Sequence, residues 1–417
     1  LKALLPRYEG RIKCIYIDPP YNTGNEGWVY NDNVNDPKIK KWLGEVVGKE
    51  GEDLTRHDKW LCMMYPRLKL LQKLLADDGV IFISIDDTEC SNLILICNEI
   101  FGASNFVANV SWQRTYSPRN DSKGIVSEVE HLVVFSKNPG WQPNKLPRTE
   151  AMDSRYKNPD NDVAPWKSSD AFAPGAATHQ GMVYAIQHPF TGEMLYPSNG
   201  RCWRYQQSSM LEYMQGWCNY RLENLHDEKE RARVCGIDES AVRKDVLAIV
   251  LEEPLEVSAA KAQKVYNRGR WPGFYFTKGG YGGIARKTYL ENVGGRLPTN
   301  LWMYEETGHT DEAKKELISL FGGRSPFDTP KPTRLLDFVL KVAGTSETLM
   351  LDSFAGSGTT AHAVLNANKA DNGNRHFILI EMMDYADSIT AERVKRVIKG
   401  YGEGKNAVEG TGGNFSF

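Results

Sequence analysis

The sequence predicts an α/β protein with a mostly parallel sheet, helices on both faces of that sheet, and one inserted domain. Short apolar runs alternate with stretches of helical periodicity at both ends of the 417-residue chain. Strands that alternate with helices need crossover connections, and these connections place parallel strands side by side. Between the two α/β sections the alternation weakens and glycine, proline and aromatic residues become frequent, which predicts the insertion.

The first α/β section covers residues 1–140. Apolar, β-leaning runs predict strands at 12–17, 80–85 and 130–135. Apolar residues spaced three and four apart predict an amphipathic helix over 57–75, which Pro66 is expected to kink. A second helix is expected after Asp86-Asp87-Thr88, and four residues form its apolar face: Leu93, Ile96, Cys97 and Ile100.

The last section, residues 306–417, repeats this alternation. Helices are expected at 311–321, 332–343, 359–366 and 384–399, and strands at 348–352 and 376–381. Thr310 and Asp384 are the expected caps of the first and last of these helices. Inside the insertion, residues 222–264 are highly charged and are predicted to be helical.

The bulk composition fits a soluble globular protein, with 41% hydrophobic and 25% charged residues. There is no apolar run of about 18 residues and no charged-then-apolar leader, so we expect a cytoplasmic protein. The net charge of −2 neither favours nor excludes nucleic acid, because a basic surface can be local. The chain opens with Leu1 and stops after a strand-like run at 414–417, so we expect an excerpt of a longer polypeptide.

The seven cysteines are scattered and form no Cys-x-x-Cys pair. Zinc sites usually show such pairs or a His-Glu-x-x-His run, which is also missing. We therefore expect no metal site, and thiols that stay reduced.

A glycine-rich loop at 352–361 predicts a site for an adenosine-type cofactor. Gly356, Gly358 and Ala361 fit the Gly-x-Gly-x-x-Gly/Ala pattern between a strand and a helix, where small residues let a ligand approach the backbone. Glu381 ends the next strand, 23 residues after Gly358, where a ribose-binding carboxylate is expected. The loop by itself does not separate a dinucleotide from S-adenosylmethionine.

The tetrad Asp18-Pro19-Pro20-Tyr21 follows the first strand directly and predicts chemistry on an amine. The exocyclic amine of adenine is a poor nucleophile because its lone pair is delocalised into the ring. A carboxylate from Asp18 and a carbonyl from Pro19 can each accept one N–H, which favours the tetrahedral nitrogen that attacks a methyl sulfonium. Tyr21 offers a ring for a base flipped out of the duplex.

The two loops resemble the amino-methyltransferases of DNA, in the β-class, whose catalytic motif precedes the cofactor motif. The catalytic resemblance extends over Asp18-Pro19-Pro20-Tyr21-Asn22-Thr23-Gly24, and Phe354-Ala355-Gly356-Ser357-Gly358-Thr359 looks like the cofactor loop. Thr329-Pro330-Lys331-Pro332 is similar to the segment that lines the methionine end in that family. Met64-Tyr65-Pro66-Arg67-Leu68 and Ile83-Ser84-Ile85-Asp86-Asp87 look most like modification (Mod) subunits of type III restriction-modification systems.

The resemblance implies a Rossmann-like methyltransferase fold that uses S-adenosylmethionine as its cofactor. It divides the chain into a catalytic half at 1–140, a target-recognition domain at 141–305 and a cofactor-binding half at 306–417. The implied catalytic residues are those of the tetrad. The implied cofactor-binding residues are Lys331, Pro332, Asp352, Phe354, Ala355, Gly356, Ser357, Gly358, Thr359 and Glu381.

The implied substrate is double-stranded DNA, methylated at N6 of adenine, because Asp opens the tetrad where N4-cytosine enzymes of the family carry Ser. Bases and phosphates are contacted mostly by Arg, Lys, Asn and Gln. The candidate DNA-binding residues are Asn22, Thr23, Arg268, Arg270, Lys278, Arg286 and Lys287. A separate restriction subunit is an expected partner, since the sequence has no Gly-x-x-x-x-Gly-Lys-Ser/Thr loop for ATP-driven steps. A homodimer is expected as well.

Other functions stay open at this point. The target could be cytosine N4, RNA, or a glutamine amide of a protein, although the last more often has Asn before the two prolines. A non-catalytic DNA-binding or assembly module is a second alternative, against which the intact tetrad and glycine loop argue. A nicotinamide dehydrogenase is a third, and the tetrad argues against it.

Overall fold

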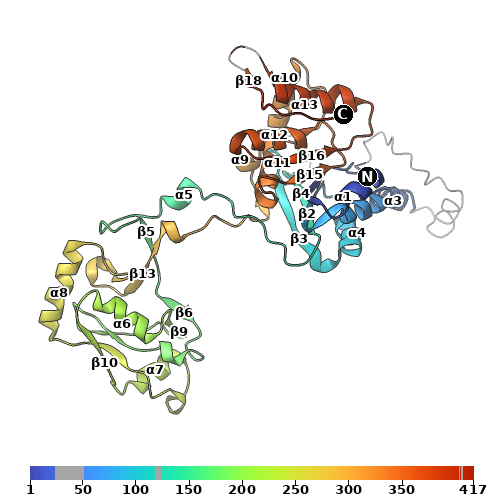
Figure 1. The fold of residues 1–417 in the computed structure, drawn as a ribbon. Coiled ribbons are helices and arrows are strands. Elements are labelled where there is room, and N and C mark those ends of the chain that lie inside the picture. The colour runs from blue at the N-terminus through green and yellow to red at the C-terminus, as the bar shows by residue number, and fades with distance from the viewer. Residues whose placement is uncertain (24–50, 118–123, 403, 405–406) are drawn as a thin grey trace. The chain divides into compact units, whose positions relative to one another are not determined.

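The chain forms two compact units in a computed structural model that describes residues 1–23, 51–117, 124–402, 404 and 407–417. Gly24, the last residue of the extended catalytic motif, lies outside the described residues. Unit 1 comprises Leu1–Leu146 and Leu297–Phe417, and unit 2 comprises Pro147–Arg296 (Figure 1). Residues 297–305, which the sequence placed in the insertion, belong to unit 1.

Unit 1 is built on a seven-stranded sheet with the order β14-β3-β4-β2-β1-β15-β16. Its strands are β1 (Ile12–Ile17), β2 (Leu75–Ile85), β3 (Phe106–Gln113), β4 (Val129–Ser136), β14 (Leu301–Trp302), β15 (Leu349–Asp352) and β16 (His376–Leu379). The pairings make β4 antiparallel to both of its neighbours, and every other pair in this sheet is parallel. The prediction of a mostly parallel sheet is confirmed; β3 and β14 were not predicted.

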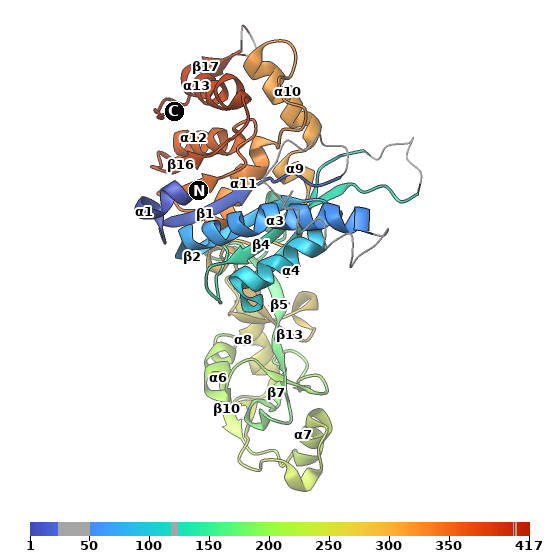
Figure 2. The same ribbon diagram turned by 90° about the vertical axis from the view of Figure 1, so that its right-hand side faces the viewer.

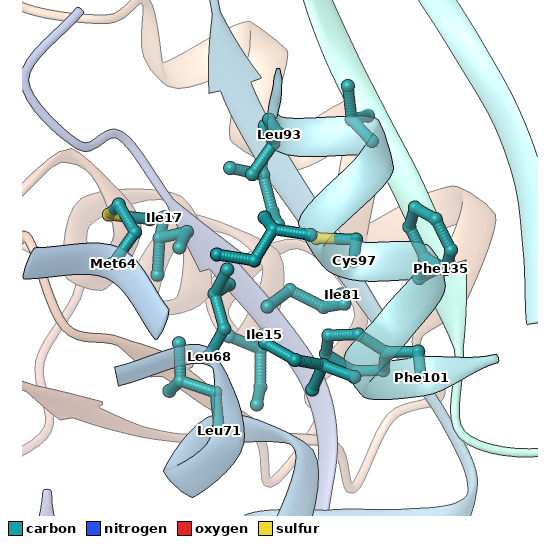
Figure 3. Close-up of a cluster of buried hydrophobic side chains, with 14 of the residues drawn as sticks. Ile15, Ile17, Met64, Leu68, Leu71, Ile81, Leu93, Cys97, Phe101 and Phe135 are labelled. Carbon is teal, nitrogen blue, oxygen red and sulfur yellow. The ribbon is translucent and has the colours of Figure 1, made fainter. Parts of the chain in front are cut away.

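Helices cover both faces of this sheet, as predicted (Figures 1 and 2). The alternation along β1 decides which side chains meet which layer, since successive side chains of a strand point to opposite faces. Ile15 and Ile17 pack with α3 (Gly51–Leu74) and α4 (Cys90–Phe101). Figure 3 shows these isoleucines among Met64, Leu68 and Leu71 of α3 and Leu93, Cys97 and Phe101 of α4.

The opposite face of β1 carries Cys14 and Tyr16. They pack in a second cluster with Leu335, Leu336 and other residues of α11 (Thr333–Ala343), and with residues of α12 (Thr359–Asp371). The remaining helical elements of unit 1 are η1 (Lys2–Leu4), α1 (Leu5–Tyr8), η3 (Ala103–Asn105), α9 (Tyr304–Thr307), α10 (Thr310–Phe321), the π-helix η8 (Ala386–Ala391) and α13 (Glu392–Lys399). A small hairpin joins β17 (Gly400–Tyr401) to β18 (Val408–Glu409).

Two helix caps differ from the prediction. The cap of α10 is His309 rather than Thr310, because the His309 ring accepts a hydrogen bond from the Glu312 amide. The last helix opens with the π-turn η8, and Asp384 does not cap it. Pro66 lies inside α3, where the sequence placed it.

Unit 2 contains three small sheets and several helices. Its strands are β5 (Trp166–Asp170), β6 (Phe172–Pro174), β7 (Ile186–Gln187), β8 (Met194–Leu195), β9 (Arg201–Trp203), β10 (Tyr220–Glu223), β11 (Ala248–Leu251), β12 (Phe274–Phe276) and β13 (Ile284–Tyr289). Its helices are α5 (Glu150–Asp153), η4 (Gln180–Met182), α6 (Gln207–Gln215), α7 (Glu228–Cys235), η5 (Glu239–Ala241), α8 (Leu255–Arg268), η6 (Lys278–Gly280) and η7 (Leu290–Asn292).

The prediction of one helical stretch over 222–264 is wrong. The structure has two strands there, β10 and β11, besides the helices α7 and α8. The burial of β11 explains the difference: all four of its residues are buried, and a short apolar run in a core is equally compatible with a strand. Trp203 and Trp217, for which a core position was favoured, are both buried.

None of the helices in the described part of the chain combines the length and the apolar character needed to cross a lipid bilayer. Among the same residues there is no cluster of three or more His, Cys, Asp or Glu side chains that could hold a metal ion.

Candidate active site

The tetrad and the glycine loop leave the sheet at neighbouring positions. β1 and β15 pair in parallel, with Cys14 opposite Met350 and Ile15 opposite Leu351. Both strands therefore end at the same edge of the sheet. There β1 continues into Asp18, and β15 continues into the glycine loop. In open α/β sheets, ligands bind at the carboxyl ends of neighbouring strands where the order of the strands reverses.

One cavity of about 490 Å³ is lined by both segments. The tetrad contributes all four of its residues. The glycine loop and its surroundings contribute Asp352, Phe354, Ala355, Gly356, Ser357, Thr359 and Glu381. Tyr21 and Gly356, from segments more than 330 residues apart in sequence, thus face one space.

Lys331 is bound to the catalytic carboxylate. Its Nζ lies 2.8 Å from Asp18 Oδ1 and 2.8 Å from Asp18 Oδ2, so the ammonium bridges both oxygens. The same Nζ lies 2.9 Å from the Tyr21 hydroxyl and 5.0 Å from the centre of the Tyr21 ring. Burial raises the pKa of Asp18, and the Lys331 ammonium opposes that rise. Burial lowers the pKa of Lys331, but Asp18 and Glu130 outweigh it and the net shift is upward, so Lys331 is charged.

Glu130 is a second carboxylate in this network. It is 5% exposed, and its Oε2 lies 3.1 Å from the Tyr21 hydroxyl and 3.5 Å from Lys331 Nζ. Its Oε1 accepts a hydrogen bond of 3.0 Å from Arg114 Nη1. The Tyr21 hydroxyl also lies 2.9 Å from Asp18 Oδ1, so its single proton can be donated to either carboxylate.

The backbone of the tetrad is anchored by buried residues behind it. The indole of Trp60 on α3 donates a 2.7 Å hydrogen bond to the Pro20 carbonyl. Asn22 has a positive φ of 60°, and its buried side chain donates to Glu89. Glu89 in turn is 2.5 Å from the His57 ring. Asn22 therefore holds the turn, and we withdraw it from the DNA-binding candidates.

The glycine loop needs its glycines for conformation. Gly356 and Gly358 have φ of +49° and +81°, values that residues with a Cβ rarely adopt. A Cβ on Gly358 would also lie 3.0 Å from the Thr390 carbonyl. Glu381 accepts a 2.8 Å hydrogen bond from the Gly356 amide, and Thr390 donates a 2.6 Å bond to the Gly356 carbonyl.

Asp352 organises the turn between β15 and α12. It accepts hydrogen bonds from the Phe354 amide at 3.0 Å and from the Thr360 hydroxyl at 2.6 Å. Burial raises its pKa to about 7, against the effect of these two donors. Its carboxyl group therefore titrates near neutral pH, inside the cavity.

A buried arginine stabilises the glycine loop through hydrogen bonds to two of its hydroxyl groups. Arg393 of α13 is 0% exposed and donates to Ser357 Oγ at 3.0 Å and Thr359 Oγ1 at 2.9 Å. Its second nitrogen pairs with Glu316 at 2.8 Å. His362 lies in the same cluster, 3.1 Å from Arg393, and burial and the arginine lower its pKa well below the usual value.

One known protein family matches a stretch of this chain that includes both motifs. The family described as "DNA methylase" matches residues 12–392. This chain belongs to that family. Its fold is the Rossmann-like methyltransferase fold that the resemblance implied.

The chain is similar to the Mod subunits of three type III restriction-modification enzymes. It is 31% identical to the StyLTI Mod subunit of Salmonella typhimurium, over 95% of this chain and 55% of the relative. It is 29% identical to the EcoPI Mod subunit of Escherichia phage P1, over 91% and 55%. It is 27% identical to the EcoP15I Mod subunit of Escherichia coli, over 96% and 59%. The chain thus spans little more than half the length of these relatives.

Two of the predicted cofactor-binding residues do not line the cavity. Pro332 is the buried N-cap of α11, and Gly358 is the N-cap of α12; neither lines the cavity. Thr23 is exposed and does line it. Lys331 lines the cavity but contacts the catalytic carboxylate.

The basic candidates in unit 2 fall into two groups. Arg268, Arg270 and Lys278 are exposed and Arg286 is half-buried. Lys287 is buried and pairs with Asp160 and Asp162 at 2.5 Å each. Its ammonium is therefore committed to the interior of unit 2, and we withdraw it as a DNA contact.

Several residues that line the cavity were not predicted from the sequence. Among them are Tyr16, Asp86, Arg114, Glu130, Phe327 and Tyr385. Asp86 follows a predicted strand, so its place at the carboxyl edge could have been predicted. Glu130 could not, because it reaches that edge only through the reversed direction of β4.

Proposed function

We propose that this protein transfers a methyl group from S-adenosylmethionine to N6 of an adenine in double-stranded DNA. The observation that carries the proposal is the single cavity lined by both the tetrad and the glycine loop. Membership of the DNA methylase family and similarity to Mod subunits support it. The chain spans little more than half of those relatives, so the partners and location of the whole protein are also proposed. We propose a restriction subunit as partner, a homodimer and a cytoplasmic location.

The cavity suits a cationic cofactor. Five acidic side chains line it, namely Asp18, Asp86, Glu130, Asp352 and Glu381, against two basic ones, Arg114 and Lys331. Such an excess of carboxylates stabilises positive charge in a partly desolvated space. The carboxylate of Glu381 would accept ribose hydroxyls, and the glycine turn would let the ligand approach the backbone. When bound, S-adenosylmethionine supplies an electrophilic methyl group on a sulfonium.

Asp18 and the Pro19 carbonyl would accept the two N–H groups of the adenine amine. This pairing directs the nitrogen lone pair away from the ring, and the negative carboxylate stabilises the positive charge that develops on the nitrogen. The methylated nitrogen must then release one proton. Burial raises the pKa of Asp18, which makes its carboxylate a suitable first acceptor.

Sequencing of DNA from cells tests this function directly. The full-length protein would be expressed in a bacterial strain without other DNA methyltransferases, and its genome sequenced by a method that reads modified bases. We expect N6-methyladenine at one short sequence motif. N4-methylcytosine instead would favour the cytosine alternative. Unmodified DNA from cells whose purified protein binds both S-adenosylmethionine and DNA would favour the non-catalytic module.

Asp18→Ala separates the catalytic role from cofactor binding. Loss of the carboxylate is expected to slow methyl transfer at least about 100-fold, because a preorganised charge is removed. The dissociation constant for S-adenosylmethionine, measured by calorimetry, should change little. The matched control is Asp58→Ala, an exposed aspartate on α3, which should retain full activity. Loss of cofactor binding together with activity would assign Asp18 to the cofactor instead.

A further inference from the structure

Lys331 occupies the place where the proposed mechanism needs the substrate. Its ammonium bridges both oxygens of Asp18 at 2.8 Å, and Asp18 is the proposed acceptor for the adenine amine. An ammonium in this position competes for the carboxylate as a hydrogen-bond donor. It also opposes the growth of positive charge on the attacking nitrogen, because like charges repel strongly at short range in a partly buried site.

A second carboxylate is already within reach of this ammonium. Glu130 Oε2 lies 3.5 Å from Lys331 Nζ, compared with 2.8 Å for Asp18. The flexible four-carbon stem of a lysine allows such a short transfer. Glu130 is itself fixed, because it is buried and its other oxygen is bound to Arg114 at 3.0 Å.

We propose that Glu130 is a positioning residue, which takes the Lys331 ammonium over from Asp18 when the amine of the target base enters. The inference rests on the proposed function. In the resting state Lys331 neutralises Asp18. When the base amine binds Asp18, the lysine pairs with Glu130 and its charge stays balanced. The Tyr21 hydroxyl, between both carboxylates, can donate to whichever of them lacks the lysine.

The test substitution is Glu130→Gln, which keeps the size of the side chain and an oxygen acceptor for Tyr21 but removes the charge that would hold Lys331. We expect the rate of methyl transfer in a single turnover, with cofactor and target DNA both saturating, to fall about 10- to 100-fold, the usual effect of losing a charged hydrogen bond. The dissociation constant for S-adenosylmethionine should change less than about threefold. The matched control is Glu128→Gln, two residues away and not part of the cavity lining.

Removing the lysine should remove the need for Glu130. In a double-mutant cycle with Lys331→Met, the further change Glu130→Gln is expected to alter the rate less than about twofold, because the two residues act through one interaction. A merely structural role of Glu130 predicts equal effects with and without the lysine, and that result would overturn the inference.

Base entry gives a readout apart from activity. 2-Aminopurine has no amine at position 6, so it can enter the cavity without displacing Lys331. Its fluorescence at the target position of a duplex, which rises when the base leaves the stack, should be the same for the wild-type protein and Glu130→Gln. A signal lost with the substitution would show that Glu130 shapes the base pocket, which would contradict the inference. Equal losses of cofactor binding and of rate would contradict it as well.

These outcomes are separable from a failure of the proposed function. A wild-type protein without methyl transfer would refute the function itself. An active wild-type protein whose Glu130→Gln variant matches Glu128→Gln would refute only the role of Glu130.

Discussion

Asp352 couples the cavity to pH at the scale of a single residue. Its pKa is raised to about 7 by burial, with Thr360 and the Phe354 amide acting in the opposite direction. Because the pKa in the folded protein lies above the unfolded value of about 3.9, this group favours the fold at acidic pH. That contribution is lost as the pH rises towards 7, where the buried carboxylate becomes charged. A cationic ligand would offset this loss.

The affinity for S-adenosylmethionine should therefore fall as the medium becomes acidic. A positive ligand lowers the pKa of Asp352 in the complex, so binding releases a proton below pH 7, and the dissociation constant should rise about tenfold from pH 8 to pH 6. Calorimetry at pH 7 in two buffers with different ionisation enthalpies would measure the released proton. Asp352→Asn should bind more weakly but with little pH dependence. If the affinity of the wild-type protein for S-adenosylmethionine did not change between pH 6 and pH 8, the coupling would be contradicted.

At the scale of elements, α13 supports the cofactor loop through one side chain. Arg393 connects α13 to Ser357 and Thr359 in the loop and to Glu316 on α10. Both the arginine and the two hydroxyl-bearing residues are buried. A buried arginine of this kind holds three segments together only while its partners remain satisfied.

Arg393→Met should destabilise unit 1 and weaken cofactor binding. Removing one partner of a buried ion pair lowers stability by about 3–5 kcal/mol, and the two loop hydroxyls lose their donor. Lys395→Met on the same helix is the control, because its ion pair with Asp387 is largely exposed and surface pairs contribute about 0–1 kcal/mol. Thermal unfolding with and without S-adenosylmethionine would compare the two. Equal midpoints for both variants would show that the loop does not depend on Arg393.

The same scale shows what the sequence could predict. The strand before the tetrad and the strand before the glycine loop were evident because each is a short apolar run that ends in a turn. That these two strands lie side by side is seen only in the structure, where β1 pairs with β15. The direction of β4 was not evident, since periodicity reports which face of a strand is buried and says nothing about its neighbours. Glu130, and with it the ion-pair network around Asp18, was missed for that reason.

At the scale of the whole molecule, the two units divide the proposed work. The cavity belongs to unit 1, and unit 2 contains the exposed basic residues proposed for DNA. Arg268 is the last residue of α8, Arg270 follows that helix, and Lys278 lies in η6. These three residues are exposed, whereas Lys287 is buried. The sequence alone could not show this difference, because a lysine paired inside a core and a lysine on a surface have the same local pattern.

The contribution of unit 2 to DNA binding can be measured through its salt dependence. Each phosphate contact adds about 0.9 to the slope of log affinity against log salt concentration, so replacing Arg268, Arg270 and Lys278 with Gln should reduce the slope by up to about 3. Binding of S-adenosylmethionine should not change, because none of the three lines the cavity. Fluorescence anisotropy with labelled duplex DNA over a range of salt concentrations would give the slope for the full-length protein.

The control for this measurement is a second set of three arginines in unit 2, Arg221, Arg233 and Arg243, also replaced with Gln. Each pairs with a carboxylate in the structure, on Glu223, Glu230 and Asp245 respectively. Their charge is partly neutralised, so their removal should change the salt slope much less than removal of the first set. Both sets remove three positive charges from the same unit, and net charge alone would affect them equally. Equal slopes for the two variants would therefore exclude a specific phosphate-binding role for the residues around α8 and η6.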